Sequence, residues 1–133
     1  MKLRSLLAAL LATAALALAD DVQKVSAEHA SKLVAAGKAV LVDVREASEW
    51  AETGVAAPAV LLAKSDFDGD QKEWKPFLEK NAGREIILYC RSGSRSGKVA
   101  AALAAKGLKV SNAGGFKEWA DAGLPVRKVE AAK

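Results

Sequence analysis

The segment CRSGSRS, residues 90–96, carries the side chains of this sequence that are best suited to chemistry. Cys90 is the single cysteine of the chain, and Arg91 and Arg95 follow it by one and five positions. The remaining residues are small: Ser92, Gly93, Ser94 and Ser96. Small residues let successive backbone N–H groups converge on one point, and such a nest binds an anion. Because amides and neighbouring cations favour a thiolate, we predict that Cys90 is a nucleophile with a lowered pKa.

A buried, inert thiol is the alternative interpretation, since free cysteine is among the most buried residue types. Inert cysteines have apolar neighbours, whereas arginine, serine and glycine surround Cys90, so we favour a reactive thiol. Arg91 is predicted to face the pocket, where its fork suits an oxyanion; a solvated loop arginine is the alternative. Arg95 is predicted to turn its guanidinium back onto the loop carbonyls or onto the first-strand region and so to hold the loop open. The serines are predicted donors, with Ser96 also serving as the N-cap of the next helix.

Hydrophobic periodicity indicates the elements that hold this segment. EIILYC reads as a buried strand that ends at Cys90, and SGKVAAALAAKG reads as the helix that follows. Helix patterns also occupy residues 27–37, 46–54 and 71–83, and a short helix that contains Phe116 and Trp119 follows a glycine turn. Strand patterns occupy residues 38–45 and 108–112, and a weak edge strand falls within 55–63. KSDFDGD, residues 64–70, has the composition of a turn.

The alternation of strands and helices predicts an α/β fold, a central, mainly parallel five-stranded sheet with helices on both faces. In such sheets, ligands bind beyond the carboxyl ends of the strands, where Cys90 lies. Asp43 and Arg45 end a neighbouring strand. We interpret them as a structural ion pair; the alternative is that they support the loop, either by pairing Asp43 with Arg95 or by bracing the loop.

Three ordered motifs resemble those of the rhodanese-like sulfurtransferases. CRSGSRS is similar to the active-site loop of that family, LVDVREASEW to its first-strand signature, and NAGGFKEWADAGLPV to its closing segment. The resemblance covers residues 25–127. One departure is the segment Gly54–Ala59, GVAAPA, which stands where many members have G-H-I-x-G-A. The missing histidine affects the local path of the chain and the pocket rim.

The resemblance implies a single rhodanese domain and a thiosulfate sulfurtransferase activity that proceeds through a Cys90 persulfide. The implied donor is a small anion such as thiosulfate, and the acceptor is a thiol, cyanide or a protein. Residues 91–96 would bind the persulfide and the substrate. The sequence suggests no cofactor and no metal, since it has no Cys/His cluster and no nucleotide-binding motif.

Two other functions remain open from the sequence. A non-enzymatic carrier of persulfide sulfur would share the same loop. A cysteine phosphatase is less favoured, because those enzymes have five residues between cysteine and arginine, whereas Cys90 and Arg95 are separated by four. A Cys–His enzyme has no evident base, since His29 is the single histidine and lies on a predicted helix far from any strand end.

The first 19 residues have the features of a secretory signal peptide: Lys2 and Arg4, then an apolar run, then Ala17-Leu18-Ala19. We expect cleavage after Ala19, a periplasmic domain of residues 20–133, and no membrane association after cleavage. Loss of the two basic residues lowers the formal charge from +4 to +2. Without a basic stripe, nothing predicts binding to nucleic acid. We expect a monomer.

Overall fold

The computed structural model describes residues 22–131. The predicted signal peptide, residues 1–19, lies outside these residues, so its interpretation stays a prediction. Within the described part of the chain, no helix combines the length and apolar character needed to cross a membrane.

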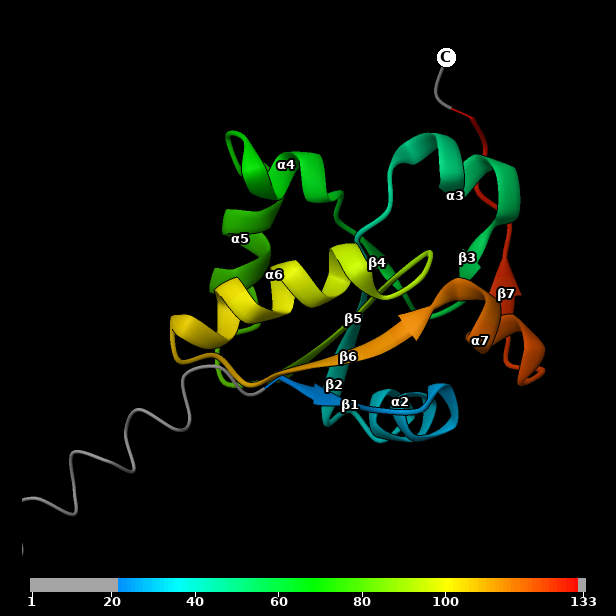
Figure 1. Ribbon diagram of the computed structural model, residues 1–133, viewed down its shortest axis with the longest axis horizontal. Coiled ribbons are helices and arrows are strands. Elements are labelled where there is room, and N and C mark those ends of the chain that lie inside the picture. Colours follow the sequence, from blue (N-terminus) through cyan, green and yellow to red (C-terminus); the bar gives the residue numbers. More distant parts are fainter. Residues whose placement is uncertain (1–21, 132–133) are drawn as a thin grey trace, which may run out of the picture.

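A five-stranded sheet forms the centre of the domain (Figure 1). Its strand order is β1 (Gln23–Lys24), β6 (Val110–Gly115), β5 (Glu85–Cys90), β2 (Ala39–Asp43) and β4 (Val60–Leu61). All four neighbouring pairs are parallel. The predicted α/β class, with its mainly parallel five-stranded sheet, is therefore confirmed. Parallel strands end at the same edge, so the end of β5 at Cys90 lies beside the ends of β2 and β6.

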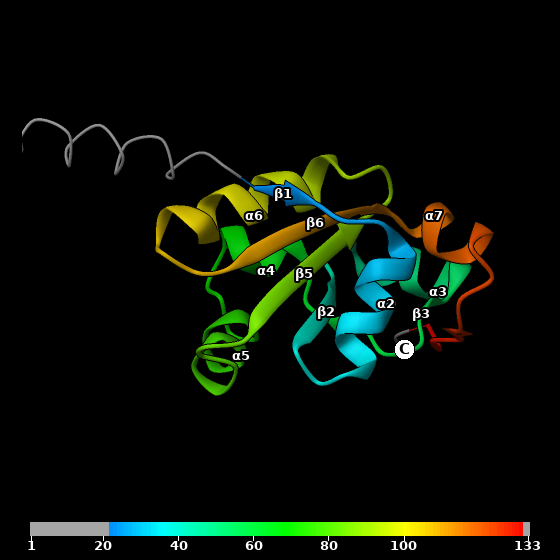
Figure 2. The same cartoon turned by 90° about the horizontal axis from the view of Figure 1, so that it is seen from below.

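Helices cover both faces of the sheet (Figure 2). One face packs against α4 (Lys64–Asp68), α5 (Trp74–Lys80) and α6 (Ser94–Ala105), and the other against α2 (Ala27–Ala35) and α7 (Phe116–Asp121). Side chains along β5 alternate between these layers, because successive residues of a strand point to opposite faces. Ile86, Leu88 and Cys90 join the α4–α6 layer, whereas Ile87 and Tyr89 join the α2–α7 layer.

Two sequence-based predictions of secondary structure were wrong. Residues 64–68, predicted as part of a turn, form α4, where Phe67 packs edge-on against Trp74 with ring centroids 5.1 Å apart. That aromatic contact and the Lys64–Asp68 ion pair favour a helical turn over the local turn composition. The helix that follows Cys90, α6, begins at Ser94 and its N-cap is Gly93, so Ser96 lies in the first turn and is not the N-cap.

The segment without the family histidine runs from α3 (Ala47–Thr53) into a second, small sheet. There β3 (Val55–Ala56) pairs antiparallel with β7 (Val126–Arg127), an element that the sequence did not predict. The guanidinium of Arg127 donates to the carbonyls of Ala57 and Ala59 at 3.1 and 2.9 Å. These bonds fix the path of the chain beside the pocket without a histidine.

Candidate functional site

Cys90 lies at the carboxyl end of β5 and is fully buried beneath the first turn of α6. Two groups donate to its sulfur: the backbone N–H of Gly93, with N and Sγ 3.0 Å apart, and the hydroxyl of Ser96, with Oγ and Sγ 3.3 Å apart. Gly93 adopts φ +96°, a left-handed conformation that favours glycine and allows the chain to fold back over the sulfur. The predicted anion-binding loop thus closes around Cys90 itself.

The environment of Cys90 lowers the pKa of its thiol. Burial alone raises that pKa, but the Ser96 hydroxyl and the backbone N–H groups of Ser96, Ser92 and Gly93 outweigh it by stabilising the thiolate. The direction agrees with the sequence-based prediction, and so do the backbone N–H groups among its causes, whereas the Ser96 hydroxyl contributes and the arginine charges are not among the main causes. Short hydrogen bonds to a buried sulfur act in a low dielectric and are screened little by salt.

Asn112, on β6, holds this arrangement from the far side of the loop. Its Nδ2 donates to the carbonyl of Gly93 at 2.9 Å, and its Oδ1 accepts from the Ser96 hydroxyl at 2.8 Å and from the N–H of Gly114 at 3.0 Å. A hydroxyl has one hydrogen, so Cys90 and Asn112 compete for that of Ser96. Sequence analysis did not identify Asn112, although its position two residues before the glycine turn Gly114-Gly115 could have indicated that it lies near the loop.

Arg95 does not turn onto the loop carbonyls, one of its two predicted positions, but points to α3, the helix that follows the first-strand region. Its two terminal nitrogens, Nη1 and Nη2, donate to Oε2 and Oε1 of Glu49 at 2.7 and 2.8 Å. This paired hydrogen bond raises the pKa of Arg95 and lowers that of Glu49 to about 2. Glu49 also accepts from the N–H of Glu46 at 3.0 Å in the capping box of α3. Glu49 therefore joins α3 to the active-site loop, a role that sequence analysis did not identify.

Asp43 and Arg45 form a buried ion pair with each other, 2.8 Å between Nη2 and Oδ2. Arg45 also donates to Thr53 Oγ1 and to the carbonyl of Gly54, each at 2.9 Å, and its Cζ lies 4.6 Å from the ring centroid of Phe116. Asp43 does not contact Arg95, which is bound to Glu49 instead. The structural ion pair, one of the two interpretations left open by the sequence, is the arrangement that the structure contains.

Glycines permit the loop to pack closely on the end of β6. Gly114 adopts φ +81°, a left-handed conformation that favours glycine, whereas Gly115 has a φ of −113°, which any residue can adopt. Gly115 is needed for space, because a Cβ there would lie 2.3 Å from the carbonyl oxygen of Arg91. This contact brings α7 and the loop together at one edge of the sheet.

A hollow of about 180 Å³ opens between α3, α7 and the active-site loop, hereafter the α3–α7 pocket. Its lining comprises Arg45, Glu49, Glu52, Thr53, Arg91, Phe116 and Lys117. Arg91 lines this pocket beside the loop and its side chain is exposed, and its contact with a substrate stays a prediction. Ser92 and Gly93 line a second hollow, of about 250 Å³, on the β1 side of the loop, and Ser94 is exposed to solvent.

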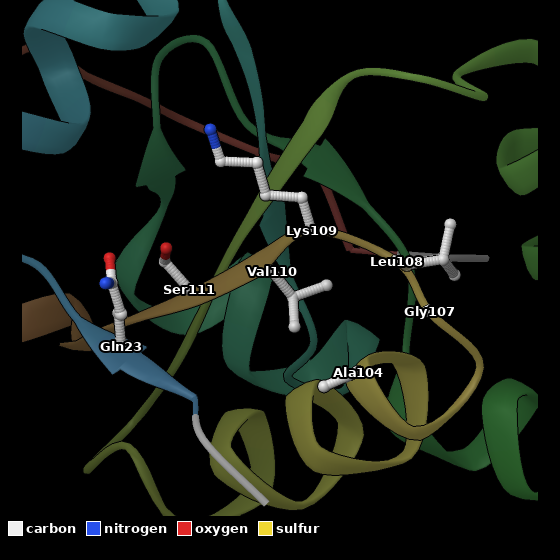
Figure 3. Close-up of a pocket in the computed structure, with 7 residues that line it drawn as sticks. All are labelled: Gln23, Ala104, Gly107, Leu108, Lys109, Val110 and Ser111. Carbon is white, nitrogen blue, oxygen red and sulfur yellow. The ribbon is translucent and has the colours of Figure 1, made fainter. Parts of the chain in front are cut away.

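Another hollow, of about 370 Å³, lies at the amino end of β6, at the opposite edge of the sheet from Cys90 (Figure 3). The one charged residue in its lining is Lys109, whose side chain extends away from Ala104 (Figure 3). None of the predicted site residues Cys90 to Ser96 lines this hollow. Among residues 22–131, no group of three or more His, Cys, Asp and Glu side chains is arranged to hold a metal ion.

Comparison with known proteins agrees with this geometry. A profile of the rhodanese-like domain matches residues 26–122, which is most of the chain. The chain belongs to the rhodanese-like domain family. An uncharacterized protein of Synechocystis is 33% identical over 95 residues, which cover 70% of this chain and 49% of that protein. This rhodanese-like chain therefore spans about half the length of that relative.

Two solved structures share the fold of this rhodanese-like domain. The polysulfide-sulfur transferase homodimer of Wolinella succinogenes is 22% identical, with a TM-score of 0.66 over 95% of this chain and 92% of that one. A protein of unknown function from Rhodopseudomonas palustris, described as a possible tyrosine phosphatase, is 24% identical, with a TM-score of 0.66 over 80% and 85%. At these identities the likeness establishes the fold alone.

Proposed function

We propose that this rhodanese-like domain is a sulfurtransferase that takes sulfane sulfur from thiosulfate and passes it to a thiol, cyanide or protein acceptor. The observation that carries the proposal is the hydrogen bonding of Cys90, whose sulfur accepts from Gly93 and Ser96 and whose thiol pKa is lowered. The family and the sulfur-transferring structural neighbour support it.

In the first step, the Cys90 thiolate attacks the outer sulfur of thiosulfate. The S–S bond of thiosulfate breaks, and its electron pair leaves with sulfite, so that Cys90 becomes a persulfide, Cys–S–S⁻. The terminal sulfur keeps a negative charge, which the N–H groups of the loop are suited to stabilise, as donors in an oxyanion hole stabilise an intermediate. Arg91, exposed at the pocket, would attract the anionic donor.

In the second step, an acceptor attacks the terminal sulfur and the electron pair of the S–S bond returns to the Cys90 sulfur. This step needs no general base when the acceptor arrives ionised, which agrees with the absence of a histidine or free carboxylate among the groups that bond to Cys90. One cysteine suffices, because the covalent intermediate is formed on it alone.

The test is intact-mass spectrometry of the reduced protein before and after addition of thiosulfate, with Cys90→Ser as the matched control. We expect the wild type to gain one sulfur atom and the variant to gain none. A wild type that gains no sulfur from thiosulfate, and none from inorganic polysulfide, would contradict sulfur transfer. Gain from polysulfide alone would contradict the proposed donor and leave sulfur transfer in place.

A persulfide carrier for a partner protein is the second candidate, and the full burial of Cys90 favours it, since a buried sulfur is hard for solutes to reach. The rate at which acceptors remove the persulfide sulfur distinguishes an enzyme from a carrier. Discharge of the loaded protein by small thiols or cyanide within seconds, repeated over many cycles, indicates an enzyme. A persulfide that survives millimolar thiol for hours indicates a carrier.

Phosphatase activity is disfavoured by the position of Arg95. Both terminal nitrogens of its guanidinium are engaged by Glu49, so the arginine that would have to bind a phosphate is directed to α3. We expect negligible hydrolysis of an aryl phosphate. Steady turnover that Cys90→Ala abolishes would overturn this expectation.

We further propose that the domain acts in the periplasm as a monomer after cleavage following Ala19. The apolar leader and its Ala17-Leu18-Ala19 end support export. Expression of the full chain in a Gram-negative bacterium, followed by N-terminal sequencing and light scattering of the periplasmic protein, tests the cleavage site, the compartment and the oligomeric state together.

A further inference from the structure

We propose that the α3–α7 pocket selects small thiols that carry both a carboxylate and an ammonium group as sulfur acceptors. This inference rests on the proposed sulfurtransferase function, and it assigns a specificity role to Glu52 and Lys117. Glu52 lies outside the three motifs, and Lys117 lies within the closing segment NAGGFKEWADAGLPV, where no role was assigned to it.

The charges in the pocket fall into two sets. At its base, Arg45 is bonded to Asp43, and Glu49 is bonded to Arg95, so these charges are already compensated. At its rim, the side chains of Arg91 and Glu52 form no hydrogen bond or ion pair with any residue in the range 22–131. Lys117 pairs with Asp121, but both side chains are well exposed, and such pairs contribute little. The rim therefore offers both positive and negative charge to a ligand.

The two signs come from different elements. Glu52 belongs to α3, Lys117 belongs to α7, and Arg91 belongs to the loop that covers Cys90. A ligand that spans the pocket can thus place an ammonium group near α3 and a carboxylate near α7 and the loop. A purely anionic thiol would meet Glu52, and a purely cationic one would meet Arg91 and Lys117, so each would lose part of the attraction.

The size of the pocket limits the acceptor. Its volume of about 180 Å³ is well below the roughly 300–1,000 Å³ of sites that hold drug-sized ligands. The ring of Phe116 forms an apolar part of the lining and is itself held against the Arg45 guanidinium. A compact amino-acid thiol of the size of cysteine matches this space, whereas a longer peptide thiol would extend into solvent.

The transfer step is balanced without a further reactant. The acceptor thiolate attacks the terminal sulfur of the Cys90 persulfide, and a new S–S bond forms on the acceptor. The bond between Sγ of Cys90 and the terminal sulfur breaks, and its electron pair returns to Sγ. The products are the Cys90 thiolate and the acceptor persulfide. The terminal sulfur lies about 2 Å from Sγ, and Arg91, the residue after Cys90, lines the pocket.

The experiment begins with full-length protein, freed of its leader in the host, loaded with inorganic polysulfide, and checked by intact mass for one added sulfur. Discharge is then timed with four thiols of similar size: 2-mercaptoethanol, cysteamine, 3-mercaptopropionate and cysteine. The ratio of variant to wild-type rate is taken for each thiol, so that the intrinsic reactivity of the thiol cancels.

We expect Glu52→Gln to slow discharge by cysteine and cysteamine about three- to tenfold and to leave 2-mercaptoethanol unchanged, since a charge contact near the surface is worth about 1 kcal/mol. Lys117→Gln is expected to slow cysteine and 3-mercaptopropionate by a similar factor. Glu79→Gln, an exposed glutamate on α5 far from α3 (Figures 1 and 2), is the matched control and is expected to change none of the rates.

Equal effects of a variant on all four thiols, or no effect on any, would overturn the acceptor assignment while leaving sulfur transfer intact. Failure of the wild type to gain sulfur at the loading stage would instead overturn the proposed function, and the acceptor assignment with it. The two failures are read at different stages, by mass and by rate.

Discussion

Replacement of Glu49 by glutamine should destabilise the domain at neutral pH. Glu49 bridges α3 and the active-site loop through its paired hydrogen bonds to Arg95, which lower the pKa of its carboxyl from 4.5 to about 2. A pKa difference of one corresponds to about 1.4 kcal/mol, so the ionised carboxylate contributes at most about 3 kcal/mol to folding. The exposed fractions of Glu49 and Arg95, 21% and 31%, reduce this value by screening, and we expect about 1–2 kcal/mol.

The pH dependence gives the sharper test. A carboxyl whose pKa is lowered on folding stabilises the protein above its unfolded pKa, near 4.5, and this stabilisation is lost as the pH falls toward 2. The difference in unfolding free energy between wild type and Glu49→Gln should therefore be full at pH 7 and shrink between pH 4.5 and pH 2. Urea titrations followed by tryptophan fluorescence at several pH values measure it.

Glutamine is the right replacement, because it preserves the capping box of α3 and removes only the charge. Glu52→Gln, one turn further along the same helix and without a partner within residues 22–131, serves as the control and should change stability by less than about 0.5 kcal/mol. A Glu49→Gln difference that stays constant from pH 7 to pH 2, or a variant as stable as wild type, would refute the reasoning.

Three other substitutions test the construction of the site. Asn112→Ala frees the Ser96 hydroxyl for Cys90 and should lower the pKa of the thiol, whereas Asn112→Asp should raise that pKa. The rate of alkylation of Cys90 as a function of pH measures both shifts. Shifts in the same direction would contradict the competition of Cys90 and Asn112 for the hydroxyl hydrogen of Ser96. Gly115→Ala places a Cβ 2.3 Å from the Arg91 carbonyl and should abolish sulfur loading in the mass assay and cost about 1–3 kcal/mol in urea. Tyr89→Phe leaves the buried Ala56 N–H without its acceptor and should cost about 1–3 kcal/mol in urea, with an unchanged stability speaking for a replacement acceptor.

The sheet and the place of the site were predictable from local pattern. EIILYC is a short apolar run with a turn after it, and parallel strands bring their carboxyl ends to one edge, so the position of Cys90 follows from its place at the end of a strand. The helix that follows was also predictable, although its start was misplaced by two residues because the left-handed Gly93 caps it.

The partners of the loop were not predictable, because they come from distant parts of the chain. Glu49 precedes Arg95 by 46 residues and Asn112 follows Ser96 by 16, and a single sequence gives no register between them. Asp43 was the more obvious partner for Arg95, since it ends a neighbouring strand. Its register partner is Tyr89, however, and Tyr89 packs in the α2–α7 layer, on the other side of the sheet from Cys90.

In this arrangement the Cys90 thiol is separate from the charged side chains that could attract a ligand. Two of the arginines near the site are committed to carboxylates, Arg45 to Asp43 and Arg95 to Glu49, so their charge serves the architecture. The thiolate is left to hydrogen bonds from the loop and from Ser96, which a persulfide can keep when its charge moves outward by one atom. The charges of Arg91 and Glu52 at the pocket rim, whose side chains have no partner within residues 22–131, then remain for the recognition that we propose.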